Sequence, residues 1–288
     1  MFTSFSRYFY KFLKLLDFLL FFLVKRNLIS KLKEYFAEDS FKKILINKKE
    51  VTFFSPNSLV DWRIDTFFSK EPETLDWIRK FDKKKDIIFW DIGANIGLYT
   101  IYAGLTHSNC KIVSFEPSSN NLRSLALNIS MNKLENRVKI FTNPLSDEND
   151  KFLMMREDEF TEGSALNCFN EQYNHEGKYK EFNINYQLLG KNIDNIIKSK
   201  ILEIPDYIKI DVDGIEHLIL EGAGLFLKDK KIKSISVEVN ENFRDQYERV
   251  LKILKINDFK FIQKKQNNEL RLSNSTFSKT FNYIFEKV

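Results

Sequence analysis

The chain has 288 residues, 43% of them apolar, which is enough for one large domain, alone or with an N-terminal appendage. Its net charge of +5, from 45 basic against 40 acidic residues, is too mild to indicate nucleic acid as a partner. Two cysteines without metal-ligand spacing exclude a disulfide-rich secreted scaffold and favour a reducing, cytoplasmic compartment.

Residues 1–45 are predicted to form an apolar and basic helical extension. The apolar run at residues 12–24 is shorter than the ~20 residues that a membrane span needs, and Lys14 and Asp17 interrupt it. Three interpretations stay open. The segment is a helix packed on the main domain or on a second subunit of a homo-oligomer, a peripheral membrane contact through residues 8–33, or a signal or spanning segment.

A lead-in segment at residues 46–85 comes next. Residues 51–56 read as a short strand and turn. Pro72 opens a helix, and the acids Glu71, Glu73 and Asp76 at its first turn favour the helix dipole.

The rest of the chain is organised around residues 87–97. An apolar run at 87–92 predicts a strand buried on both faces, and it leads through Gly93 and Gly97 into a helical pattern. A strand, a glycine-bearing turn and a helix N-terminus let a ligand approach the backbone closely. Asp91 stands at the end of this strand.

A second apolar run, residues 111–116, ends in Glu116, and Pro117 fixes where it stops. An acid at this place can accept hydrogen bonds from a ribose diol. The turn lacks the third glycine of the dinucleotide fingerprint, and Asp91 would repel a pyrophosphate but suits the ammonium of a methionine moiety. These residues predict S-adenosylmethionine as the cofactor, with an NAD-dependent oxidoreductase as the rival.

The middle of the chain adds a helix at 121–131 and a strand at 138–141. Within the polar segment 148–190, residues 152–155 and 182–186 are predicted to pair as a hairpin. The loop between them is too long to be a mere connection, and we expect it to close over the acceptor.

A second organising block lies at 208–214, where a buried strand ends in Asp211 and turns at Gly214. Open α/β sheets bind ligands at the carboxyl ends of their strands, so Asp91 and Asp211 are predicted to cap adjacent central strands. Further strand-like runs lie at 234–240, 259–262 and 281–285.

Residues 91–100, 115–117 and 208–216, taken together and in this order, resemble the three signature blocks of the FkbM-type methyltransferases. The resemblance runs from about Val51 to the C-terminus. It implies an α/β class I methyltransferase fold in residues 86–288, with a seven-stranded mostly parallel sheet that ends in an antiparallel hairpin. It also implies a hydroxyl acceptor on a sugar, glycolipid or natural product.

The resemblance assigns roles to particular residues. The donor site would comprise Asp91, Gly93, Ala94, Asn95, Gly97, Glu116 and Pro117, and Leu145 and Ser146 would contact adenine. Asp213 stands where the family more often has Glu. Arg63 and Glu71 match an Arg and an acid of the family; an ion pair between them and a contact with the acceptor both stay open.

Methyl transfer to a hydroxyl requires alignment and a group that takes the proton. Asp211 is the first choice for this group, with Asp213 and Glu238 in reserve. Asp211, Asp213, Glu216 and Glu238 also offer oxygen ligands to a divalent cation, but no histidine completes a softer site, and we predict no metal. A non-catalytic cofactor-binding scaffold is the second rival.

Overall fold

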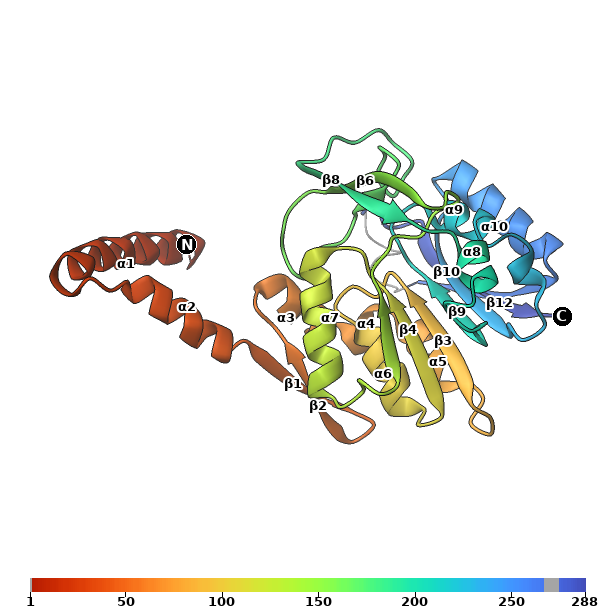
Figure 1. Cartoon of the computed structure of the whole chain (residues 1–288), viewed down its shortest axis with the longest axis horizontal. Coiled ribbons are helices and arrows are strands. Elements are labelled where there is room, and N and C mark those ends of the chain that lie inside the picture. The colour runs from red at the N-terminus through yellow and green to blue at the C-terminus, as the bar shows by residue number, and fades with distance from the viewer. Residues whose placement is uncertain (1, 267–274) are drawn as a thin grey trace.

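The computed structural model describes residues 2–266 and 275–288, and its centre is a seven-stranded sheet (Figure 1). In chain order its strands are β3 (Ile87–Ile92), β4 (Cys110–Phe115), β5 (Val138–Phe141), β9 (Tyr207–Ile210), β10 (Ser234–Asn240), β11 (Phe259–Lys265) and β12 (Thr280–Lys287). Their order across the sheet is β11-β12-β10-β9-β3-β4-β5. Strand β12 pairs antiparallel with β10 and β11, and the other pairs are parallel. The predicted fold class is confirmed, including the hairpin at the sheet edge.

Helices cover both faces of this sheet (Figure 1). They are α5 (Pro72–Arg79), α6 (Leu98–Thr106), α7 (Ser119–Met131), α8 (Ile193–Lys198), α9 (Glu216–Glu221), the 3-10 helix η1 (Gly224–Lys228) and α10 (Arg244–Ile256). Successive residues of β3 point to opposite faces, so Phe89 joins the core under α5, α6 and α7, whereas Trp90 joins the core under α8, α9 and α10. Burial on both faces explains the unbroken apolar run of this strand.

Two small structures flank the main sheet. A hairpin of β1 (Phe41–Ile46) and β2 (Lys49–Phe54) leads into the helices α3 (Ser58–Asp65) and α4 (Phe67–Lys70), and β1 straddles the expected boundary between residues 45 and 46. A three-stranded sheet consists of β6 (Lys151–Glu157), β7 (Cys168–Phe169) and β8 (Ile184–Gly190). Strand β6 pairs antiparallel with β8, as predicted for these two runs, but β8 extends to Gly190 and β7, which was not predicted, pairs with the other edge of β6.

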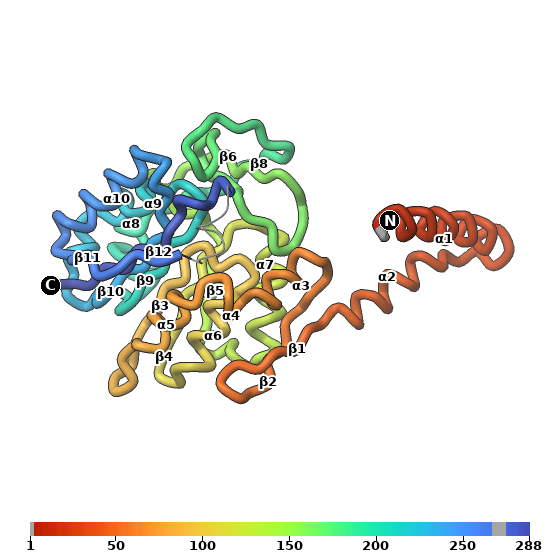
Figure 2. Tube along the Cα trace, turned by 180° about the vertical axis from the view of Figure 1, so that it is seen from behind, coloured from red at the N-terminus to blue at the C-terminus, as the bar shows by residue number. Residues whose placement is uncertain are grey.

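The N-terminal residues form the helices α1 (Phe2–Val24) and α2 (Leu28–Glu38), which pack against each other. Asp17 Oδ1 accepts a hydrogen bond from the Ile29 amide at 2.9 Å, which caps the first turn of α2. Figures 1 and 2 show that this pair of helices projects away from the main domain, so α1 does not pack on it. Among the described residues, no helix is both long and apolar enough to cross a membrane.

Candidate active site

The turn after β3 is packed against two neighbouring strands. Gly93 has φ +83°, and a Cβ built on it would lie 1.8 Å from the carbonyl oxygen of Asp211. The amides of Gly93 and Ala94 both donate to the carbonyl oxygen of Phe115, each at 3.0 Å. Only a glycine fits where β3 and β9 approach so closely, and this is the physical reason for the first glycine of the motif. Gly97, at φ +87°, then begins α6.

Glu116 lies at the end of β4 with only 5% of its surface exposed. One carboxyl oxygen accepts from the Asn95 amide at 2.7 Å, and the other accepts from the Ser118 amide at 2.9 Å. Burial raises the pKa of Glu116 to about 7, although these two backbone hydrogen bonds oppose the shift. The carboxyl group therefore has a fixed orientation and changes charge near neutral pH.

A cavity with about 630 Å³ of empty space, counting its open mouth, lies at the carboxyl ends of β3, β4 and β9. Seven of the predicted site residues line it: Gly93, Asn95, Glu116, Pro117, Leu145, Asp211 and Asp213. The sheet thus brings together three segments that are far apart in sequence.

The other predicted site residues do not line this cavity. Asp91 is fully buried, and its Oδ2 accepts from the Thr100 hydroxyl of α6 at 2.7 Å. Ala94 belongs to the core under α6 and α7, and Gly97 has Leu125 beside it. The hydroxyl of Ser146 donates to Asp147 at 2.9 Å. One carboxyl oxygen of Glu238, the fifth residue, lies within 4.8 Å of one of Asp211.

Residues 162–167 form one wall of the cavity through Ser164, Ala165 and Asn167. Asn95 donates to the carbonyl oxygen of Ser164 at 2.8 Å, and Asp213 accepts from the Leu166 amide at 2.6 Å. Arg63 donates through Nε to the carbonyl oxygen of Gly163 at 2.6 Å. The segment is thereby tied to both organising turns of the sheet. A role for Arg63 in an ion pair with Glu71 is wrong, since Glu71 pairs with Lys70 at 3.2 Å.

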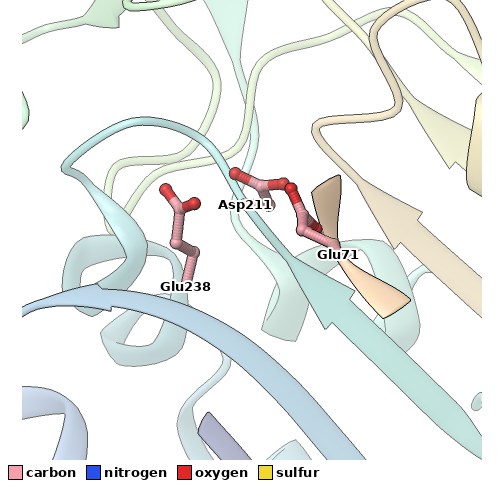
Figure 3. A group of neighbouring side chains, drawn as sticks. All are labelled: Glu71, Asp211 and Glu238. Atoms are coloured by element: carbon pink, nitrogen blue, oxygen red, sulfur yellow. The ribbon is translucent and has the colours of Figure 1, made fainter. Parts of the chain in front are cut away.

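Three carboxyl groups meet beside the cavity, from Glu71, Asp211 and Glu238 (Figure 3). One oxygen of each lies within 4.8 Å of the others. Glu71 accepts from the Tyr99 hydroxyl at 2.8 Å. Its burial opposes charge, but Lys70, Lys209 and this hydrogen bond lower the pKa of Glu71 to about 2.

Glu238 differs from the other two acids. Burial, followed by the negative charges of Asp211, Asp213 and Glu71, raises its pKa well above the ordinary value. Its carboxyl group has no hydrogen-bond or ion-pair partner among the described residues. Glu238 therefore holds a proton more tightly than Glu71.

Lys209 on β9 is a site residue that was not predicted from the sequence. It is 1% exposed, and its Nζ contacts Asp211 Oδ2 at 2.6 Å and lies 4.8 Å from the centre of the Tyr99 ring. Burial opposes its charge, but the negative charges of Asp211, Asp91 and Glu71 outweigh burial and raise its pKa. The available signal was a single lysine within an otherwise apolar strand.

The three acids that lie together differ from the four that the sequence offers as ligands for a divalent cation. Glu71 takes part in place of Asp213 and Glu216. Glu216 instead accepts from the amides of Val212 at 3.0 Å and Gly214 at 3.1 Å, so it fixes the turn after β9. Lys70 and Lys209 already supply two positive charges to the three acids, and a proton on Glu238 would balance the third.

Comparisons with known proteins support one family. A model of the methyltransferase FkbM domain matches residues 91–261. The solved structure of methyltransferase FkbM from Methylobacillus flagellatus KT is similar at 16% identity and TM-score 0.46, covering 70% of this chain and 45% of that one. No curated protein sequence matches the chain.

Two further solved structures are similar to parts of this chain. The precorrin-6y C5,15-methyltransferase of Geobacter metallireducens GS-15 is 14% identical with TM-score 0.42, covering 76% of this chain and 87% of that one. The tRNA m1G37 methyltransferase of M. jannaschii is 11% identical with TM-score 0.45, covering 86% of this chain and 57% of that one.

Proposed function

Because the chain belongs to the FkbM methyltransferase family, we propose that it transfers a methyl group from S-adenosyl-L-methionine to a hydroxyl group of its acceptor. The observation that carries the proposal is the buried carboxyl group of Glu116 beside a backbone turn that Gly93 keeps free of side chains. A carboxylate next to an open strand-end cavity matches the ribose and the backbone-bound portion of a nucleoside donor.

The residues present fit this donor. Glu116 would accept hydrogen bonds from the ribose hydroxyls through its remaining lone pairs. Leu145 offers an apolar wall for adenine, and Gly93 and Asn95 lie where the methionine portion would approach. Bound there, the donor would supply an electrophilic methyl group on a positively charged sulfur. Asp91 would act on this site indirectly, because its negative charge attracts Lys209, which in turn pairs with Asp211.

Glu116 predicts how donor binding depends on pH. Ribose hydroxyls donate to the ionised carboxylate, so binding should release a proton from a group whose pKa is about 7. Affinity for S-adenosylhomocysteine should therefore be higher at about pH 8 than at about pH 6. The Glu116→Gln variant should bind about ten- to a hundredfold more weakly at the higher pH and lose this dependence. Titration calorimetry in two buffers of different ionisation enthalpy measures both effects; a pH-independent affinity of the wild type would contradict the assignment.

For the acceptor, we assign the proton-accepting role to Glu238, with Asp211 orienting the hydroxyl group. Asp211 is held by Lys209, and Glu71 is held by Lys70 and Tyr99, so neither is free to take a proton. Glu238 has no such partner, and a carboxyl group with a raised pKa is the stronger base once it is ionised. Asp213 is occupied by the Leu166 amide.

A Glu238→Gln variant tests this assignment. We expect kcat to fall by about 10²- to 10⁴-fold while the affinity for S-adenosylhomocysteine stays unchanged. Since only ionised Glu238 accepts a proton and its pKa is raised, wild-type kcat should increase with pH, and the variant should lose this increase. Glu241→Gln is the matched control, because Glu241 pairs with Lys264 just beyond the same strand. A variant that retains wild-type kcat would return the role to Asp211.

The acceptor that we propose is a hydroxyl of a sugar, glycolipid or natural product. The deciding experiment is methyl transfer from labelled donor to cell-envelope glycan extracts, followed by mass spectrometry of the labelled product. Calorimetry with S-adenosylhomocysteine and with NADH provides the matching control. Tight binding of NADH alone would reject the donor and favour an oxidoreductase.

A further inference from the structure

Helix α1 exposes an apolar stripe that nothing in the described chain covers. Its members lie on one side of the helix, mostly three or four residues apart, and each is more than half exposed: Phe5, Tyr8, Phe9, Phe12, Leu15, Leu19 and Leu23. Helix α2 packs on the neighbouring strip at Leu13, Leu16 and Leu20, which are partly buried. The apolar stripe therefore continues along the helix on the side that α2 leaves open.

Basic side chains lie on another side of the same helix. Arg7, Lys11 and Lys14 are spaced by four and three residues, which places them together on one side of the helix, where Lys11 borders the apolar stripe beside Tyr8. Phe18, which is 60% exposed, follows Lys14 by one turn on this side. Lys25 and Arg26 follow at the end of the helix. Asp17 is the only acid in residues 2–26, and it is used to cap α2.

The basic side chains also lie close to aromatic rings. Lys11 Nζ is 5.8 Å from the centre of the Tyr8 ring, and Lys14 Nζ is 5.1 Å from that of Tyr10. Long cationic side chains that run beside aromatic rings can keep their charge at a polar boundary while the rings enter an apolar phase. This arrangement suits an interface between water and lipid.

We infer that α1 docks on an anionic lipid surface, with the apolar stripe in the acyl boundary and Arg7, Lys11 and Lys14 among the headgroups. Charge decides between lipid and a second copy of the chain. A second α1 would offer the same basic face and no free acid to complement it, whereas anionic headgroups supply the opposite charge. The inference concerns docking and does not depend on the proposed methyl transfer.

Vesicle flotation of the full chain tests the inference without any substrate. We expect flotation with vesicles of equal parts phosphatidylcholine and phosphatidylglycerol, and much weaker flotation with phosphatidylcholine alone or at high salt. Each basic residue at an anionic surface contributes roughly fivefold, so Arg7→Glu/Lys11→Glu/Lys14→Glu should lower partitioning by at least roughly a hundredfold. The matched control is Lys83→Glu/Lys84→Glu/Lys85→Glu, in the exposed loop before β3 and away from α1 in both views.

A second variant, Phe9→Ser/Phe12→Ser/Leu19→Ser, removes part of the apolar stripe. It should abolish flotation and leave thermal unfolding of the main domain unchanged, because these side chains belong to neither core. Light scattering after size exclusion, without lipid, gives the oligomeric state. The inference is overturned if the wild-type chain does not float with anionic vesicles. It is also overturned if the wild-type chain is a dimer and this variant is a monomer.

Discussion

A Gly93→Ala variant is expected to lose nearly all donor binding and to be destabilised by roughly 3–5 kcal/mol. The added Cβ would lie 1.8 Å from a backbone carbonyl oxygen, that of Asp211, which no side-chain rotation can move aside. Relief requires β3 and β9 to separate at the ends where the cavity forms. At φ +83° an L side chain is also strained. Urea unfolding and calorimetry with S-adenosylhomocysteine measure the two losses.

Gly224→Ala separates the clash from the strain. Gly224 also has positive φ, at +54°, but a Cβ there would meet nothing nearer than 3.5 Å. We expect a loss of only about 1–2 kcal/mol and unchanged donor binding. Should Gly93→Ala resemble this control, the close approach of the two strands would not be what defines the site.

A Lys209→Met variant is expected to lose about 3–5 kcal/mol of stability, since it removes the cation from fully buried Asp91 and partly buried Asp211. The pH dependence of this stability loss follows from Asp91. Burial raises the pKa of Asp91 and the charge of Lys209 opposes this rise, so without Lys209 this pKa in the folded state should rise further above that in the unfolded chain. Folding then binds protons, and the defect grows as pH rises from about 5 to about 8. Urea unfolding at the two pH values measures it.

Lys233→Met is the control for this experiment. Lys233 also lies between two acids, Asp82 at 3.4 Å and Asp206 at 3.3 Å, but its side chain is 37% exposed. Solvent screens such a pair, so we expect a loss below about 1 kcal/mol with little dependence on pH. Equal losses in both variants would show that Lys209 is not the centre of a buried charge network.

Much of the fold follows from local pattern. Residues 87–92, 138–141 and 234–240 form strands at the predicted positions, because apolar runs between helical segments leave little choice in an α/β sheet. Strand β1 was not predicted, since Lys42 and Lys43 interrupt its pattern and only Ile46 is buried. An edge hairpin can carry charges that a central strand cannot.

The site was less predictable than the sheet. The meeting of Gly93, Glu116 and Asp211 follows from strand order, which the motifs imply. The position of Asp91 follows from the two-residue period of β3, which turns it to the face opposite Ile92. The attraction between the charges of Lys209 and Glu71 acts between β9 and the segment between α4 and α5, and no local pattern signals such a long-range interaction.

The wall at residues 162–167 has a consequence for turnover. Anything seated in the cavity lies beside a segment that Asn95, Asp213 and Arg63 fasten by hydrogen bonds. The spent nucleoside can leave through the open mouth while all of these bonds stay closed. Residues 162–167 would then keep one shape through the whole cycle, and product release would need no local unfolding of this wall.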